Sequence, residues 1–226
     1  MSLTPPVEPS AGALTARQLS LFGVAAVDPT PGDLAGLLAG PGQISRMGGT
    51  VRVSVRVDDP WRVHVLVAEL RLRGLTPNWR QLPEGGGLVV RTAYTAVLAR
   101  LGAGWLHPPP DAHRTNEAAG PEPGDEDERL VKRPPTGFHL AGQRLRLWAA
   151  AAGLRDQLGY RLGLDVADAD NWPQVGAALA AIGLPAVLLD AGSGGPAYRI
   201  VGRRRLTRLA ELLGDRPAAA PVDGWA

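Results

Sequence analysis

The chain of 226 residues contains no cysteine, carries a formal net charge of +2 and is 45% hydrophobic. Its length allows one large domain or two small ones with a buried core. The absence of cysteine excludes a disulfide scaffold, thiol catalysis and zinc sites with cysteine ligands. No apolar run approaches the ~18 residues of a membrane span, and the proline-containing N-terminus does not resemble a signal peptide. We therefore expect a cytoplasmic protein that does not contact a membrane.

Arginine supplies every basic residue of the chain except Lys132. Arginine binds phosphate in bidentate geometry, so this bias is compatible with a nucleic-acid partner. Alanine, glycine and proline are abundant as well, and a GC-rich genome would explain all four together. A net charge of +2 does not identify nucleic acid by itself.

The N-terminal half begins with residues 1–14, which contain three prolines and are predicted to be disordered. The first folded unit is predicted over residues 15–104. It opens with a helix around Thr15–Phe22 and a second helix over Pro31–Ala39. Strict alternation over Val51–Val57 then predicts a half-buried strand, which forms a hairpin with a short strand before Gly48-Gly49.

The rest of this unit is predicted to contain a helix, a second hairpin and a closing helix. Asp59-Pro60 and Gly74 are start and stop signals of a helix, although the valines between them also fit a strand. Strands over Leu75–Leu82 and Leu88–Tyr94 flank a glycine turn. A helix over Ala96–Leu101 ends the unit.

Residues 105–135 are predicted to form a proline-rich acidic linker. They include the acidic run Asp125–Glu128 and show no apolar periodicity. The linker carries a net charge of −3, whereas the segments before and after it carry +3 and +2. The acidic run is either a solvated part of the linker or an autoinhibitory segment that folds back over a basic groove.

The second folded unit is predicted over residues 136–215 and repeats the order of the first, and residues 216–226 are predicted to be a flexible tail. Its expected elements are a helix over Gln143–Ala152, a strand over Tyr160–Val166, a helix from Asn171 to Ile182, strands over Pro185–Asp190 and Ala197–Val201, and a helix over Arg203–Leu213. Each unit has the order αββαββα. The predicted fold class is therefore α+β, with two pseudo-symmetric units built on antiparallel sheets.

The first helix of each unit carries a resemblance to a known family. The segment Leu34-Ala35-Gly36-Leu37-Leu38-Ala39-Gly40-Pro41-Gly42 resembles the motif of the LAGLIDADG homing endonucleases. Residues 145–153 are a fainter second copy that keeps the small residues and the final glycine. The resemblance implies two helices packed closely at a pseudo-twofold axis, a saddle formed by the two sheets, and a monomeric pseudo-dimer that binds double-stranded DNA on the concave face.

One departure from the family concerns its chemistry. In the family, the acid before the last glycine of each motif holds metal ions that activate water. Here Pro41 and Ala152 occupy these positions, and neither side chain ligates a metal. Asp33, Asp59 and Asp170 are better interpreted as helix caps. We therefore expect no enzymatic activity, no metal and no cofactor, although an active nuclease with unrecognised ligands remains an alternative.

Arginines on the predicted sheet face are the candidate DNA contacts. Because the valines of residues 51–57 are expected to face the helices, the residues between them face outward. Such arginines would contact mainly phosphate. The cluster at residues 203–205 lies at a helix start, where a phosphate, Asp190 or the acidic linker would offset its charge. The candidate residues are Arg46, Arg52, Arg56, Arg80, Arg91, Arg161, Arg199, Arg203, Arg204 and Arg205.

These observations favour a catalytically inactive, homing-endonuclease-like protein that binds double-stranded DNA in a regulatory or nucleoid-related role. A sporulation regulator that carries such a fold beside a helix-turn-helix segment is a precedent, although no such segment is recognised here. The alternatives are RNA binding, an adaptor that binds proteins through the same scaffold, and arginines that are ordinary solvated residues of a sheet.

Overall fold

The computed structural model describes residues 27–83, 86–109 and 130–226. The predicted disorder of residues 1–14, the helix around Thr15–Phe22 and the acidic run Asp125–Glu128 lie outside these ranges. Among the helices of the described ranges, none has the length and apolar character needed to span a membrane.

The first unit contains a four-stranded antiparallel sheet with the strand order β1-β2-β4-β3. In chain order, its elements are η2 (Pro31–Leu34), α1 (Ala35–Ala39), β1 (Gln43–Met47), β2 (Thr50–Val57), α2 (Pro60–Leu72), β3 (Pro77–Gln81), β4 (Leu88–Thr92), η4 (Ala96–Leu98) and α3 (Ala99–Trp105). The valines of β2 are buried and the residues between them are not, which confirms the predicted alternation. The segment after Asp59 is a helix, as predicted, and Gly74 follows it with a φ of 70°.

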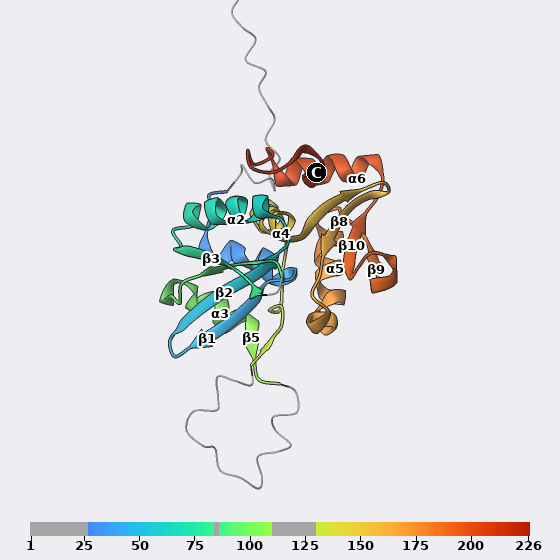
Figure 1. Cartoon of the computed structure of the whole chain (residues 1–226). Helices are drawn as coiled ribbons and strands as arrows, with labels where there is room; N and C mark the ends of the chain where they lie inside the picture. The colour runs from blue at the N-terminus through green and yellow to red at the C-terminus, as the bar shows by residue number, and fades with distance from the viewer. Residues whose placement is uncertain (1–26, 84–85, 110–129) are drawn as a thin grey trace, which may run out of the picture.

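The second unit contains another four-stranded antiparallel sheet, with the order β7-β8-β10-β9. Its elements are α4 (Gly142–Ala152), β7 (Gly153–Asp156), β8 (Gly159–Gly163), η5 (Val166–Asn171), α5 (Trp172–Ala181), β9 (Val187–Leu189), η6 (Ala191–Ser193), β10 (Ala197–Ile200) and α6 (Arg203–Leu213). The inner and outer strands therefore follow the same order in both sheets. Figure 1 shows the first sheet at left and the second at right, with α4 between them. The predicted α+β class is confirmed.

Helices α1 and α4 pack together where the two units meet. A Cβ atom built on Gly36 of α1 would lie 1.8 Å from the carbonyl oxygen of Arg144 in α4. A Cβ atom on Gly40 would lie 2.3 Å from the indole nitrogen of Trp148. Both glycines belong to the segment that resembles the LAGLIDADG motif. Small residues are therefore required for this close approach of the two helices.

A buried group of charged side chains also joins the two units. The guanidinium group of Arg73, at the end of α2, donates to Asp33 (3.2 Å), Glu69 (2.8 Å) and Gln143 (2.7 Å). Arg146 of α4 donates to the second carboxylate oxygen of Glu69 at 2.6 Å. The two cations balance the two acids, as buried charges require.

The ends of the predicted linker are ordered, contrary to expectation. Leu106–His107 (β5) pairs with Val131–Lys132 (β6), and Trp105 is only 2% exposed. The Trp105 ring meets the edge of Phe138, with 5.3 Å between the ring centroids. Prolines around these residues suggested a loose segment, but the buried tryptophan fixes both ends of it against the core.

The predicted flexible tail after residue 216 is also wrong. The tail contains the 3-10 helix η7 (Val222–Gly224), and Ala220 and Trp225 are buried. The guanidinium carbon of Arg146 lies 5.2 Å from the centre of the Trp225 ring. Burial of one aromatic side chain therefore orders a segment whose composition alone suggested disorder.

Two predicted helix caps differ in the structure. Asp59 is the residue before α2, but its side chain accepts from Arg62 at 3.4 Å rather than from a helix N–H. Asp170 lies inside η5, and Asp165 caps that element by accepting from the N–H of Ala167 at 2.9 Å. Asp33 accepts from the N–H of Thr30 at 2.7 Å, as a residue at a helix start should.

Candidate functional site

The open face of the first sheet carries four arginines. Residues directly opposite each other in an antiparallel pair share a face. Arg56 lies opposite Val89, which lies opposite Arg80, and Arg91 lies opposite Ser54. Since Arg52 and Arg56 alternate with the buried valines of β2, all four side chains lie on the face away from the core. We call Arg52, Arg56, Arg80 and Arg91 the first arginine face.

Polar and aromatic groups surround the first arginine face, and its four strands contain no acidic residue. Arg91 donates to the side-chain oxygen of Asn78 at 2.7 Å. Arg52 lies over the ring of Tyr94, with 4.4 Å to the ring centre. Arg56 and Arg80 are exposed, and neither forms an ion pair among the described residues. Positive charge is therefore concentrated on this face, whose strands supply no acid to neutralise it.

Arg46 does not join this face, so that expectation is wrong. It lies opposite Val51, whose side chain is buried and lies close to α3, where a Cβ atom on Gly102 would meet it at 2.5 Å. The glycine hairpin fixes a register in which Arg46 shares the face of the buried valines. A shift of one residue reverses every side chain of a strand, so this outcome depends entirely on the turn.

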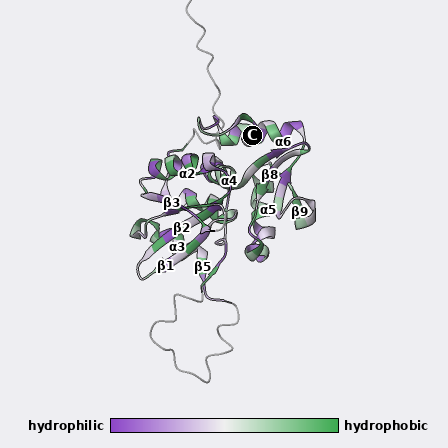
Figure 2. Ribbon diagram, in the orientation of Figure 1, coloured by the Kyte–Doolittle hydropathy of each residue, from purple (hydrophilic) through white to green (hydrophobic). Residues whose placement is uncertain are grey.

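The cluster Arg203–Arg205 is exposed in the first turn of α6 and not on a sheet. Helix α6 is amphipathic, since Leu209, Leu212 and Leu213 are buried on its opposite side. Figure 2 shows the resulting exchange of hydrophilic and hydrophobic residues along α6. The predicted position of this cluster at a helix start, apart from the sheet arginines, is therefore confirmed.

The open face of the second sheet has a different charge arrangement. Arg199 of β10 lies directly opposite Arg161 of β8. One carboxylate oxygen of Asp156 lies 2.9 Å from Nη2 of Arg199 and 3.1 Å from Nε of Arg161. The two predicted DNA contacts on this sheet are therefore brought together, but each is paired with the same acid. Exposed Leu154 and Val187 lie on the same face, one on either side of the pair.

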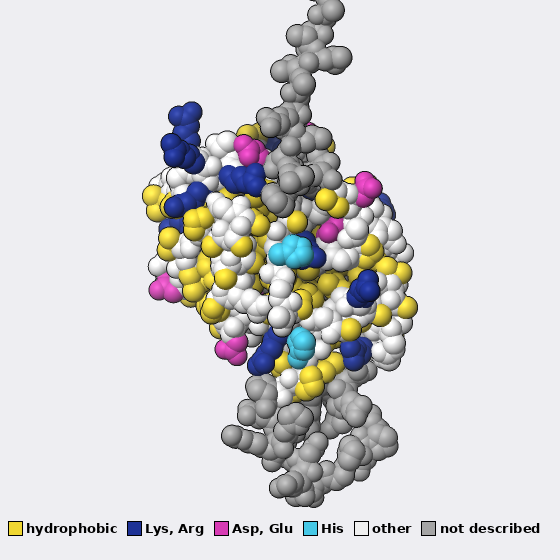
Figure 3. Space-filling view, turned by 180° about the vertical axis from the view of Figure 1, so that it is seen from behind, with side chains coloured by type: hydrophobic (Ala, Val, Ile, Leu, Met, Phe, Trp, Pro, Cys, Tyr) yellow, Lys and Arg dark blue, Asp and Glu magenta, His cyan; other side chains and the backbone are white. Residues whose placement is uncertain are grey.

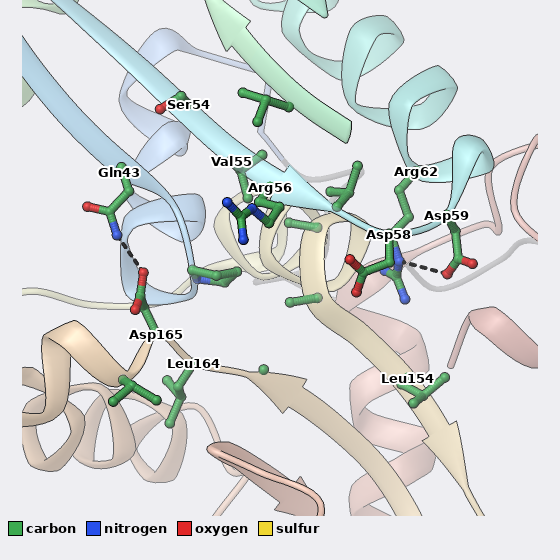
Figure 4. Close-up of a pocket in the computed structure, with 17 residues that line it drawn as sticks. Gln43, Ser54, Val55, Arg56, Asp58, Asp59, Arg62, Leu154, Leu164 and Asp165 are labelled. Carbon is green, nitrogen blue, oxygen red and sulfur yellow. Dashed lines mark hydrogen bonds and ion pairs between the residues drawn. The ribbon is translucent and has the colours of Figure 1, made fainter. Parts of the chain in front are cut away.

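A cavity of about 760 Å³ lies where the ends of β2, β7 and β8 meet. Figure 4 shows Arg56 projecting into this cavity, with Gln43 and Asp165 in contact at one side of it. The side-chain nitrogen of Gln43 donates to Asp165 at 2.5 Å. Pro41 and Ala152, at the two motif positions, also line the cavity. The cavity therefore lies between the two arginine-bearing sheet faces.

A basic side chain binds the C-terminal carbonyls of each central helix beside this cavity. Arg62 donates to the carbonyl oxygens of Ala150 (3.1 Å) and Gly153 (2.6 Å) at the end of α4. Lys132 donates to the carbonyl of Gly42 (2.6 Å) after α1. Cations at helix C-termini are favoured because the carbonyl groups there are unpaired and the helix dipole is negative at that end.

Lys132 also forms an ion pair of 2.5 Å with Asp168. Burial lowers the pKa of the Lys132 ammonium, and the nearby Asp168 carboxylate partly opposes this shift. Burial likewise raises the pKa of Asp168, although Lys132 acts in the opposite direction. The Lys132–Asp168 pair is thus largely buried, and Lys132 fixes the segment after α1 through the Gly42 carbonyl. Sequence reasoning assigned Lys132 no role, although it is the one lysine among many arginines.

The residues around the cavity do not fit a metal ion. Asp59 is paired with Arg62, and Asp165 is used by Gln43 and the start of η5. Within residues 27–83, 86–109 and 130–226, no group of three or more His, Asp or Glu side chains is arranged to hold a metal. Pro41 and Ala152 supply no donor. The acids Asp58, Asp59 and Asp165 line the cavity but do not form such a group among the described residues.

The side of the molecule that is turned away in Figure 1 has a largely hydrophobic surface with scattered charges. Figure 3, seen from behind, shows hydrophobic side chains over much of that side, with Lys and Arg side chains scattered rather than gathered. No protein-family model matches the chain, and a search of curated proteins finds no match either.

Proposed function

We propose that this protein binds double-stranded DNA through the first arginine face, on a LAGLIDADG-like scaffold that has no nuclease centre. The observation that carries the proposal is the placement of Arg52, Arg56, Arg80 and Arg91 on one open sheet face whose strands contain no acid. Phosphate contacts by arginine supply most of the affinity of such interfaces. A strand pair of a sheet also fits the width of the major groove.

Three features support the LAGLIDADG-like part of the proposal. Both units have the same order of elements and of strands. The small residues of the first motif lie where α1 approaches α4. The cavity that contains Pro41 and Ala152 lies at the ends of both central helices, where the family places its acids. The two sheet faces would then form the sides of one saddle around that cavity.

The side chains that line the cavity support the part of the proposal that concerns the missing nuclease centre. A two-metal mechanism needs carboxylates free to bridge the ions. Here Arg62 and Lys132 bind the helix ends, Asp59 is paired with Arg62 and Asp165 accepts from Gln43, so of the three acids that line the cavity two are used by protein groups. We therefore propose that the cavity is part of the DNA-binding surface and is not a catalytic site.

A salt titration of a labelled duplex tests the proposal. The log of the binding constant should fall linearly with the log of salt concentration. The double variant Arg56→Gln/Arg80→Gln should weaken binding about tenfold and reduce the slope by about two, because two phosphate contacts are lost. The matched control is Arg71→Gln, an exposed arginine of α2 outside the sheet, which should leave both quantities unchanged.

Absence of binding to the duplex at low salt would refute the proposal. An equal or stronger affinity for double-stranded RNA would redirect it to RNA. An adaptor function is the second candidate, and the exposed Leu154 and Val187 on the second sheet favour it. If the folded protein binds neither DNA nor RNA, the adaptor function is the candidate that remains.

A further inference from the structure

The second sheet contains a pair of arginines whose geometry suits a phosphate group, but a carboxylate already occupies the place between them. Asp156 Oδ2 accepts from Nε of Arg199 at 3.1 Å and lies 2.9 Å from its Nη2. The same oxygen lies 3.1 Å from Nε of Arg161. Two guanidinium groups converging on one oxygen is the arrangement expected for bound phosphate.

The position of Asp156 is fixed by the hairpin that joins β7 and β8. Its other oxygen, Oδ1, accepts from the N–H groups of Leu158 (2.9 Å) and Gly159 (2.8 Å). Partial desolvation opposes ionisation, but these N–H groups and Arg199 together lower the pKa of the Asp156 carboxyl. The carboxylate is thus held in place by four groups and does not depend on a rotamer of an exposed side chain.

The strand register explains why an acid is needed here. Arg161 and Arg199 lie directly opposite each other, and like charges in that position destabilise a sheet. In the first sheet the register separates the charges, since Arg91 lies opposite Ser54 and Arg56 opposite Val89. The first sheet therefore tolerates arginines without an acid in its strands, whereas the second sheet requires an acid.

The pairing also affects binding. To reach a phosphate, Arg161 and Arg199 would have to leave Asp156, and the phosphate would then face an anion that the hairpin holds in place. The interaction would exchange one anion for another and gain little. Arg161 is restrained further because its Nη1 donates to the carbonyl of Gly194 at 2.7 Å.

We infer that Asp156 acts as an internal substitute for phosphate, which keeps Arg161 and Arg199 from DNA and restricts phosphate binding to the first arginine face. This inference rests on the proposed function. It deepens that proposal by making the interface one-sided, although the scaffold has two similar halves. It also identifies a closed phosphate site that a single substitution opens.

The test compares two matched arginine pairs in the same duplex titration. Arg56→Gln/Arg80→Gln should weaken binding about tenfold, whereas Arg161→Gln/Arg199→Gln should change it by less than about twofold. Asp156→Asn should strengthen binding about tenfold, since two arginines become available. It should also steepen the slope of the log binding constant against the log of salt concentration by about one to two. The asparagine oxygen can still accept from Leu158 and Gly159, so the hairpin is retained.

The triple variant Asp156→Asn/Arg161→Gln/Arg199→Gln is the control, and it should return to the affinity of the unsubstituted protein. Unchanged affinity of a folded Asp156→Asn variant would overturn the inference, as would equal losses from the two arginine pairs. If the unsubstituted protein fails to bind but Asp156→Asn binds, the proposed function fails and the closed site stands. If neither binds, both fail.

Discussion

The first and second sheets have the same strand order, yet their open faces differ in charge. The first face carries Arg52, Arg56, Arg80 and Arg91 and no acid in its strands. The second carries Arg161 and Arg199, both paired with Asp156. Strand order is therefore compatible with quite different surface chemistry. What sets the chemistry is the register, because it decides whether arginines lie side by side or apart.

The contact between the two units, which we call the seam, contains charged residues in a third arrangement. There Arg73, Arg146, Asp33 and Glu69 are buried and balance one another. Charge thus holds the two units together in this buried group, is neutralised on the second sheet, and on the first sheet has no acid within the four strands to neutralise it. Each assignment predicts a different sensitivity of folding to the loss of one charged side chain.

The largest expected effect comes from the seam. Replacing Arg73 with methionine leaves Asp33 without its arginine and Glu69 with Arg146 alone, in a buried site. Loss of one partner of a buried charge group costs about 3–5 kcal/mol of the free energy of unfolding. Urea denaturation measures this loss. Arg71→Met, in the last turn of the same helix but exposed, should change stability by less than about 0.5 kcal/mol. Similar losses for the two variants would contradict the assignment.

The contact between α1 and α4 should give a smaller effect. Gly36→Ala places a methyl group 1.8 Å from the Arg144 carbonyl oxygen, so the helices must separate. Overpacking of this kind costs about 1–3 kcal/mol. In α3, Gly104→Ala is the matched control, since its Cβ would lie 4.0 Å from Pro135. There alanine should stabilise the helix by up to about 1 kcal/mol. Thermal unfolding of both variants measures these changes. A gain in stability for Gly36→Ala would exclude tight packing between α1 and α4.

Much of the fold could be predicted from local sequence signals. Alternation predicted β2, and Pro60 with Gly74 predicted the bounds of α2, because these signals depend on neighbouring residues. The order of Trp105 and Trp225 could not be predicted in this way. Both are buried by residues distant in the sequence, Phe138 and Arg146, and composition near each one suggested a loop.

The candidate site was predicted in part for the same reason. Alternation along one strand placed Arg52 and Arg56 correctly, but the side of Arg46 depends on a hairpin register that the sequence did not specify. The partnership of Asp156 with Arg161 and Arg199 joins three strands, so only the folded sheet reveals it. A signal was nevertheless present, since Asp156 is the only acid within the four strands of the second sheet.

The smallest expected effect on folding distinguishes the two sheet faces directly. Asp156→Asn should cost about 1 kcal/mol at neutral pH, because the ion pairs are partly exposed and the backbone contacts are retained.

The pKa of Asp156 is lowered in the folded state, so its contribution to stability is present above the ordinary aspartate pKa. It is lost as the pH falls through the folded pKa. The difference in the free energy of unfolding between the unsubstituted protein and Asp156→Asn should therefore stay constant between neutral pH and mild acid and shrink in strong acid. On the first face, Arg56→Gln should change stability by less than about 0.5 kcal/mol at any of these pH values, since Arg56 is exposed and forms no ion pair with the part of the chain that the structure describes. Denaturation curves across pH measure both differences. A loss for Arg56→Gln as large as that for Asp156→Asn would mean that the first face is neutralised as well, and the contrast between the sheets would disappear.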